Sequence, residues 1–317
     1  MPFTRETVTV ESFYTQNASQ LNLKLIAGAG GLKRIIREST VNRPGLALTG
    51  FTKYFAMKRV QVFGNAEYYY CRSLPKEERA KRYESFFHYA VPCVVFSRDL
   101  EPDKQFIQAA EKADVPVFVT SLITMKFLNA STIALDAMFA PKGTEMGSMV
   151  DILGVGVIIK GESGIGKSES VLALVERGYS LVSDDITLVT LVDGRKVVGT
   201  SKELTRNLME VRGIGIVDVA SMFGVKSIRK EKRVDLVVSL LAWDPTMNID
   251  RLGMEQEFTK ILGIEVPHMK IPVRPGRDLG RLIEVAAFHT KLRMSGLNPA
   301  KDLNDRLVSR MRLSQGL

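Results

Sequence analysis

The segment Gly161-Glu162-Ser163-Gly164-Ile165-Gly166-Lys167-Ser168 decides the fold, because it is a complete G-x-x-x-x-G-K-[ST] phosphate-binding loop. Such a loop has meaning only where it connects a strand to a helix, so the flanking sequence tests it. Before it, residues 152–159 are apolar and rich in β-branched side chains, which predicts a buried parallel strand. After it, apolar residues recur at helical spacing from Lys167, and Gly178 stands where a helix C-cap is expected. Strand, loop and helix therefore follow in the required order.

The residue types of this loop suit a nucleoside triphosphate. Its glycines let backbone N–H groups converge on phosphate oxygens, and the N-terminus of the following helix adds positive potential. Lys167 is placed to reach the outer phosphates, and Ser168 offers its hydroxyl to magnesium. We therefore expect Gly161 to Ser168 to bind a nucleoside triphosphate with Mg²⁺. An ordinary glycine turn is the alternative interpretation.

Size and charge limit the class of protein. The 317 residues suggest two domains, and a hydrophobic content of 45% suffices for two buried cores. The net charge is +9, and the densest basic run, residues 226–233, contains no aromatic side chain that could stack on a base. We interpret that run as a solvated loop and expect no nucleic-acid partner.

The cysteines and the apolar runs indicate the compartment. Cys71 and Cys93 are far apart and have no zinc-type or C-x-x-C spacing, so both are expected to be reduced thiols. The N-terminal residues lack the apolar core of a signal peptide, and no apolar run approaches the length of a membrane span. These features predict a cytoplasmic protein without a membrane segment.

The first third of the chain predicts an α/β unit of its own. Strands are expected at 91–96 and 115–120, and helices at 103–113 and 122–139. Alternation of this kind is typical of a parallel sheet with helices packed on it.

A polar, turn-rich segment at 140–145 leads from this unit into the nucleotide-binding part of the chain. We place the boundary just before it, near residue 132. The predicted domains are therefore 1–132, an N-terminal α/β domain, and 133–317, a C-terminal domain that contains the phosphate loop.

Two adjacent acids follow the next predicted strand. Residues 179–182 predict a strand that ends at Asp184 and Asp185, where an open α/β sheet would expose carboxylates beside the nucleotide. Neighbouring residues at a strand end point to opposite sides, so one acid could serve the metal while the other faces the acceptor. A turn or a helix N-cap would explain such a pair equally well.

Three further segments carry charges that phosphoryl transfer could use. Glu210 and Arg212 lie next to two glycines, Arg251 lies in a turn at 250–253, and residues 272–277 hold two arginines in a segment stiffened by proline. Taken singly, each segment is compatible with a solvated surface.

Taken in order, these segments resemble the bacterial HPr kinase/phosphorylase family. The likeness covers nearly the whole chain, because residues 43–50 are similar to the family's N-terminal signature and residues 283–287 to the start of its C-terminal helix. The segments that carry the resemblance are 161–169, 184–185, 210–213, 250–253 and 272–277.

The resemblance implies a fold and an activity. The fold would be an N-terminal α/β domain followed by a P-loop nucleotide-binding domain of the HPr kinase/PEP carboxykinase type with a C-terminal helix. The activity would be ATP-dependent phosphorylation of a serine of the phosphocarrier protein HPr, and its reversal by phosphorolysis, in which phosphate is consumed and pyrophosphate released. Such enzymes regulate carbon metabolism and assemble as hexamers. Residues 272–277 match the part of the family linked to dephosphorylation.

The resemblance also implies roles for single residues. Lys167 would contact the outer phosphates, and Ser168 and Glu210 would hold magnesium. Asp185 would accept the proton of the serine hydroxyl in the forward direction and return it in reverse. Arg251 would stabilise developing charge.

One position departs from the family pattern. The family carries a histidine followed by glycine fifteen residues before the first glycine of the loop, where this chain has Met146-Gly147. A thioether cannot hold or transfer a proton as an imidazole can. Two alternatives follow: a catalytically weakened nucleotide-binding sensor, and a kinase for a different acceptor. The acceptor and the balance of the two directions stay open at this stage.

Overall fold

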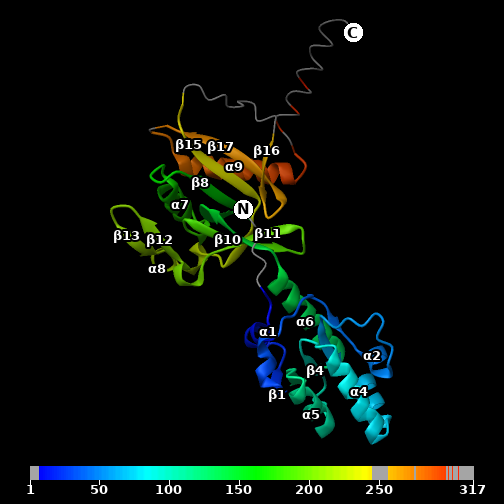
Figure 1. The fold of residues 1–317 in the computed structure, drawn as a ribbon. Helices are drawn as coiled ribbons and strands as arrows, with labels where there is room; N and C mark the ends of the chain where they lie inside the picture. Colours follow the sequence, from blue (N-terminus) through cyan, green and yellow to red (C-terminus); the bar gives the residue numbers. More distant parts are fainter. Residues whose placement is uncertain are drawn as a thin grey trace, which may run out of the picture. The chain divides into compact units, whose positions relative to one another are not determined.

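The computed structural model describes residues 7–244, 256–274 and 276–297, and positions 299, 302 and 306. The chain divides into two compact units, one ending at Ala140 and the other beginning at Pro141. Figure 1 shows the elements of each unit. Residue 132, where the sequence placed the boundary, lies inside helix α6 (Thr124–Phe139), which belongs to the first unit.

The first unit contains a sheet with the strand order β1-β5-β4-β3-β2 among the described residues. Neighbours from β5 to β2 are parallel, and only β1 is antiparallel to its neighbour β5. The parallel sheet expected from the alternation of strands and helices is therefore confirmed. The strands are β1 (Leu23–Ala27), β2 (Val41–Asn42), β3 (Val60–Phe63), β4 (Val94–Phe96) and β5 (Val117–Thr120).

Helices cover both faces of this sheet. Alternate residues of β4 point to opposite sides, so Val94 and Phe96 join one core and Val95 joins the other. The first core packs under α3, α4 and α5, and the second under α1 and α6. Burying each of the large apolar side chains contributes about 1.5–3 kcal/mol. The helices of this unit besides α6 are α1 (Val10–Asn17), η1 (Ala29–Lys33), α2 (Gly45–Thr49), α3 (Asn65–Ser73), α4 (Lys76–His88) and α5 (Lys104–Lys112).

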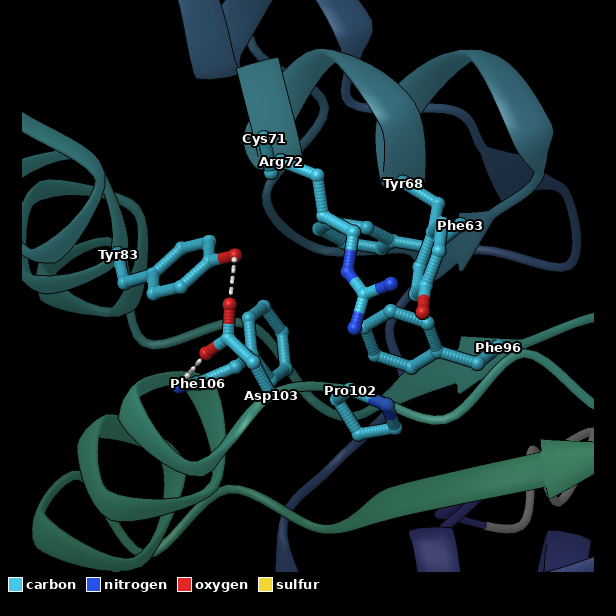
Figure 2. Close-up of a pocket in the computed structure, with 9 residues that line it drawn as sticks. All are labelled: Phe63, Tyr68, Cys71, Arg72, Tyr83, Phe96, Pro102, Asp103 and Phe106. Atoms are coloured by element: carbon cyan, nitrogen blue, oxygen red, sulfur yellow. Dashed lines mark hydrogen bonds between the residues drawn. The ribbon is translucent and has the colours of Figure 1, made fainter. Parts of the chain in front are cut away.

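A small aromatic-lined pocket lies in the first of these cores, and Figure 2 shows it. The Tyr83 hydroxyl donates to Asp103 at 3.2 Å, and Asp103 also caps the N-terminus of α5. The cavity has a volume of about 10 Å³, which leaves room for about one water molecule. This pocket is therefore a packing feature of the core. Its lining residues are Phe63, Tyr68, Cys71, Arg72, Tyr83, Phe96, Pro102, Asp103 and Phe106.

The second unit is built on a sheet with the order β16-β17-β15-β8-β7-β9 within the described part of the chain. β8 is parallel to β15, and β15 is parallel to β17, so the carboxyl ends of these three strands meet at one edge. The other neighbours are antiparallel. The strands are β7 (Ser148–Ile152), β8 (Val155–Gly161), β9 (Ser180–Ser183), β15 (Leu236–Ala242), β16 (Glu257–Ile261) and β17 (Ile264–Val273).

The strand expected at 152–159 is two strands joined by a tight turn. Ile152 ends β7, and Leu153 and Gly154 both have positive φ, at 49° and 91°, as a two-residue hairpin turn requires. β8 then begins at Val155 and runs parallel to β15 as expected. The expectation failed because both arms of the hairpin are buried and apolar, so no change of pattern marks the turn.

A second, antiparallel sheet packs against one face of the first. Its order is β14-β11-β10-β6 among the described residues, and Val189 and Val197 share a core with Met149, Ile158 and Val237 of the first sheet. The opposite face of the first sheet is covered by α7 and α9. The remaining elements are β6 (Lys142–Met146), α7 (Lys167–Glu176), β10 (Ile186–Val192), β11 (Lys196–Thr200), η2 (Glu203–Thr205), β12 (Leu208–Val211), β13 (Gly215–Asp218), α8 (Val219–Phe223), η3 (Val225–Ser227), β14 (Glu231–Arg233) and α9 (Leu279–Met294).

The basic run at 226–233 is more ordered than the solvated loop predicted for it. It includes β14, which pairs with β11, and Arg229 and Lys232 form ion pairs with the buried Asp151 at 2.9 and 3.7 Å. Part of the run's charge is therefore neutralised within the fold.

Two expectations about the whole chain can be compared with the structure. Cys71 and Cys93 are both free, as predicted, and both are buried. Within the described residues, no helix combines the length and apolar character needed to span a membrane.

Candidate active site

The phosphate loop connects β8 to α7 at the carboxyl edge of the parallel strands. β8 ends at Gly161 and α7 begins at Lys167, so the predicted order of strand, loop and helix is present. Gly164 and Gly166 have φ values of +86° and +103°, which other residues adopt only with strain. The glycines of the motif are therefore required by the backbone that turns the loop into the helix.

One polar pocket of about 110 Å³ lies at this loop. It brings together Lys167, Ser168, Asp185 and Glu210, which were predicted as site residues from separate parts of the sequence. Arg251, also predicted, lies outside the described residues. The pocket is lined by Ser163, Gly164, Gly166, Lys167, Ser168, Glu169, Asp185, Glu210 and Arg212.

Two cationic side chains lie on the loop. The Lys167 ammonium donates to the backbone oxygens of Gly161 and Glu162, both at 2.9 Å. The Arg212 guanidinium donates to the Ser163 hydroxyl at 2.8 Å. Positive charge therefore gathers where the glycine backbone would receive phosphate oxygens. The sequence analysis left open whether Arg212 serves phosphoryl transfer or the surface, and the structure places it in the pocket.

A β-hairpin carries Glu210 and Arg212 to the loop. β12 pairs with β13, with Glu210 opposite Ile216 and Val211 opposite Gly215. Val211 is buried in the core beneath α7, whereas Glu210 and Arg212 are exposed. Alternation along β12 turns Glu210 away from the core, and Arg212, in the turn directly after β12, also lines the pocket.

The two adjacent acids lie in the turn between β9 and β10, the alternative to a strand end, and they have different surroundings. Asp184 is half-buried and accepts hydrogen bonds from the Ser148 hydroxyl at 2.8 Å and the Glu210 amide at 3.1 Å. Burial raises the pKa of Asp184, and these two hydrogen bonds oppose that effect. Asp185 is exposed and lines the pocket. Asp185 is therefore the acid available to a substrate.

The oxygen ligands of the pocket fit a magnesium ion. The Ser168 hydroxyl and the Glu210 carboxylate line it together. Among the described residues, no group of three or more His, Cys, Asp or Glu side chains could hold a metal. Magnesium commonly takes one or two protein ligands and completes its shell with phosphate oxygens and water, so this sparse set suits it.

Met146, where the resemblance implies a histidine, lies beside the Asp185 turn. It is the last residue of β6, is 64% exposed and pairs in register with Ile186, the residue after Asp185. The next amide, that of Gly147, donates to the Asp185 carbonyl at 2.7 Å. A histidine at this position would therefore start from the strand that borders the aspartate.

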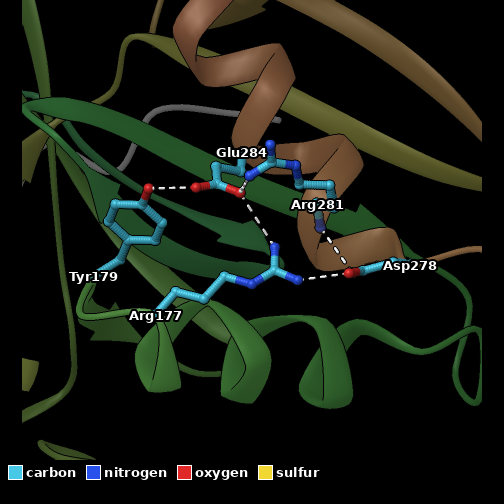
Figure 3. Close-up of polar contacts among 5 residues, drawn as sticks. All are labelled: Arg177, Tyr179, Asp278, Arg281 and Glu284. Atoms are coloured by element: carbon cyan, nitrogen blue, oxygen red, sulfur yellow. Dashed lines mark hydrogen bonds and ion pairs between the residues drawn. The ribbon is translucent and has the colours of Figure 1, made fainter.

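The first turn of α9 packs on the phosphate-loop helix. A Cβ atom added to Gly166 would lie 3.2 Å from Leu279, and one added to Gly280 would lie 3.2 Å from Ala173. Figure 3 shows the polar network that closes this contact: Arg177 bridges Asp278 and Glu284, which are both on the α9 side. The segment 272–277, of which Pro275 lies outside the described residues, leads directly into this turn.

The parallel strands, the glycine loop and the polar pocket define the class of α/β proteins that carry a phosphate-binding loop. Family models narrow this class. The HPr Serine kinase C-terminal domain matches residues 137–307, and the HPr Serine kinase N terminus matches residues 8–135. The chain belongs to the HPr kinase/phosphorylase family, as the order of its motifs predicted.

Curated relatives match the chain over almost its full length. The HPr kinase/phosphorylase of Caldanaerobacter subterraneus subsp. tengcongensis is 42% identical over 96% of this chain and 99% of its own. The protein of the same name from Chloroherpeton thalassium is 40% identical over 96% of this chain and 91% of its own. A solved structure, the Hpr(Ser) kinase/phosphatase from Coxiella burnetii, is 32% identical, covers 52% of this chain and 98% of its own, and superposes with a TM-score of 0.47.

Proposed function

We propose that this protein is an ATP-dependent serine kinase of the phosphocarrier protein HPr that also removes the phosphate by phosphorolysis, and so regulates carbon metabolism. Membership of the HPr kinase/phosphorylase family supports the activity. The observation that carries the proposal is the single pocket shared by Lys167, Ser168, Asp185 and Glu210. These are the groups that phosphoryl transfer needs for charge, metal and proton.

In the forward direction, Asp185 accepts the proton of the attacking serine hydroxyl. The serine oxygen bonds to the γ-phosphorus as the bond to the β-phosphate oxygen breaks, and ADP leaves. Lys167 holds the outer phosphates and neutralises charge that develops on them. Ser168 and Glu210 would hold Mg²⁺, which supplies further charge neutralisation when bound. Arg251, outside the described residues, is proposed as a second charge stabiliser.

In the reverse direction, an oxygen of inorganic phosphate attacks the phosphorus of phosphoserine and the bond to the serine oxygen breaks. Asp185 gives a proton to that oxygen, because the serine oxygen is the leaving group here and the attacking group in the forward direction. Pyrophosphate is the second product. The position of 272–277 next to the turn that packs on Gly166 supports a role for this segment in the reverse step. The hexameric assembly and the cytoplasmic location expected from the sequence stay predictions.

The forward reaction is tested with purified protein, ATP, Mg²⁺ and HPr. Phosphoserine on HPr, detected by intact mass and peptide mapping, is the expected product. Absence of phosphate on HPr at saturating ATP, together with transfer to another acceptor in a screen with labelled ATP, would contradict the acceptor but not the kinase chemistry.

The Met146→His variant separates an active enzyme from the weakened sensor considered above. If the site is otherwise complete, imidazole beside Asp185 raises turnover over the wild type. Met146→Gln, which is polar but does not titrate, is the matched control. Negligible turnover in the wild type and in both variants, with nucleotide binding retained, would favour the sensor.

A further inference from the structure

The turn that presents Asp185 is strained. Asp185 has φ +54°, and the Ile186 amide donates to the Asp184 carbonyl at 2.5 Å, so the three residues form a γ-turn with a left-handed centre. Turns of this hand are rare, and a non-glycine residue in such a conformation costs about 1–3 kcal/mol. The conformation persists only where the surrounding structure holds it.

Two hydrogen bonds from the link between β6 and β7 hold the backbone of Asp185. The Gly147 amide donates to the Asp185 carbonyl at 2.7 Å, and the Asp185 amide donates to the Ser148 hydroxyl at 3.2 Å. Ser148 is completely buried, so its hydroxyl has few alternative partners. Its single proton goes to the Asp184 carboxylate at 2.8 Å. Ser148 therefore contacts both residues of the acid pair.

Asp184 joins this turn to the hairpin that carries Glu210. One of its oxygens accepts from Ser148, and the other accepts from the backbone amide of Glu210 at 3.1 Å. Both oxygens are thus engaged by the protein, and Asp184 does not contribute to the lining of the pocket, whereas Asp185 and Glu210 do. Asp184 therefore links the Asp185 turn to β12 through hydrogen bonds. The side chains of these two segments must meet at the reacting phosphate.

We propose that Ser148 and Asp184 are positioning residues: together they hold the strained Asp185 turn and the Glu210 strand at the separation that phosphoryl transfer requires. The proposal rests on the proposed function. Ser148 holds the Asp185 amide and the Asp184 carboxylate, and Asp184 connects the turn to β12. Neither side chain is required to touch a substrate.

The proposal distinguishes hydrogen bonding from charge at Asp184. In Asp184→Asn, the amide oxygen can accept from the Glu210 amide while the amide nitrogen donates to a free lone pair of the Ser148 hydroxyl. Both contacts are therefore kept without the negative charge, with the one to Ser148 reversed in direction. Asp184→Ala loses both, and Ser148→Ala loses the two bonds that its hydroxyl makes. A base or a metal ligand at Asp184 would instead fail equally with Asn and Ala.

Asp235→Ala is the matched control for the loss of a buried carboxylate. Asp235 is buried in the same unit, accepts from the Gly156 amide at 2.9 Å and pairs with Arg233. It lies at the amino end of β8 and β15, whereas the phosphate loop follows the carboxyl end of β8. Its removal should lower the melting temperature without changing turnover of the folded protein.

The experiment measures HPr phosphorylation, binding of a non-hydrolysable ATP analogue and amide hydrogen exchange for these variants. Asp184→Ala and Ser148→Ala should lower kcat on the order of 100-fold, the cost of a misplaced reacting group, with little change in nucleotide affinity. Exchange at the Asp185 or Glu210 amides should accelerate. Asp184→Asn should stay close to the wild type in both measurements.

Four results would overturn the proposal. Asp184→Asn as inactive as Asp184→Ala would show that the charge itself acts in the reaction. Wild-type kcat in Ser148→Ala, or an equal loss of kcat in Asp235→Ala, would remove the positioning role. If the wild type fails to phosphorylate HPr, the proposed function fails, and unchanged exchange in Asp184→Ala and Ser148→Ala would refute positioning independently.

Discussion

The Gly164→Ala substitution has two effects: it strains the backbone of the loop, and it disturbs the phosphate site. Gly164 has φ +86°, so alanine there is held in a left-handed conformation that costs about 1–2 kcal/mol. The new Cβ would also lie 2.9 Å from the nearest guanidinium nitrogen of Arg212, closer than real contacts allow. Because that end of Arg212 is flexible, it moves away and loses its hydrogen bond to Ser163.

Gly154→Ala is the control, because it introduces the backbone strain without a clash at the phosphate site. Gly154 has φ +91° and is exposed like Gly164, but a Cβ there meets no atom within 4 Å. Both variants should therefore lower the melting temperature by similar amounts. Losing an exposed, charge-assisted hydrogen bond and crowding the phosphate cradle should cost Gly164→Ala about a further 1 kcal/mol in nucleotide binding, or about fivefold in affinity.

Isothermal titration with ATP and Mg²⁺, next to thermal unfolding of each variant, measures the two costs separately. The expected result is unchanged ATP affinity in Gly154→Ala and weakened affinity in Gly164→Ala at comparable melting temperatures. Equal ATP affinities in the two variants would refute the assignment of this loop and Arg212 to the nucleotide site.

Three further predictions concern the base, the α9 network and the thiols. Asp185→Asn should lower kcat for HPr phosphorylation by about two to four powers of ten while ATP binding is retained, measured by single-turnover kinetics and titration. The hydrogen bond from the Tyr179 hydroxyl, at 2.6 Å, holds the pKa of the buried Glu284 below its usual range. The ionised form therefore stabilises the fold above about pH 4.3, the ordinary glutamate pKa, and that stabilisation is lost as pH falls through the lower folded-state pKa. Glu284→Gln should lower the melting temperature at neutral pH, with the difference from wild type shrinking in acid; a constant difference would contradict this. Burial raises the pKa of Cys71 to about 11 and that of Cys93 well above its usual range, so a thiolate-specific reagent at pH 8 should label them only after unfolding.

Residues of the site could be predicted from the sequence where they belong to a recognisable local motif. The phosphate loop has a complete motif, and Glu210 and Arg212 stand in a charged segment next to two glycines. The acid pair was recognised after a predicted strand, and the structure places it in the turn after β9, where Ser148 holds Asp184 and Asp185 lines the pocket.

Other features depend on contacts that no local pattern records. The hairpin turn at Leu153 and Gly154 is hidden because both flanking strands are buried and apolar. The basic run at 226–233 was predicted to be solvated, since nothing nearby in sequence indicates that Asp151 of β7 pairs with it. Ser148 is an isolated serine in the sequence, and only the fold brings it to the acid pair.

Tracing the γ-phosphate of ATP through both directions tests the central claim most directly. Wild-type protein, HPr and ATP labelled at the γ-phosphorus should give HPr labelled on a serine. After removal of nucleotide, unlabelled inorganic phosphate should release that label as pyrophosphate. Label that never reaches HPr, or that leaves it as inorganic phosphate, would contradict an enzyme that transfers and retrieves the phosphoryl group in one pocket.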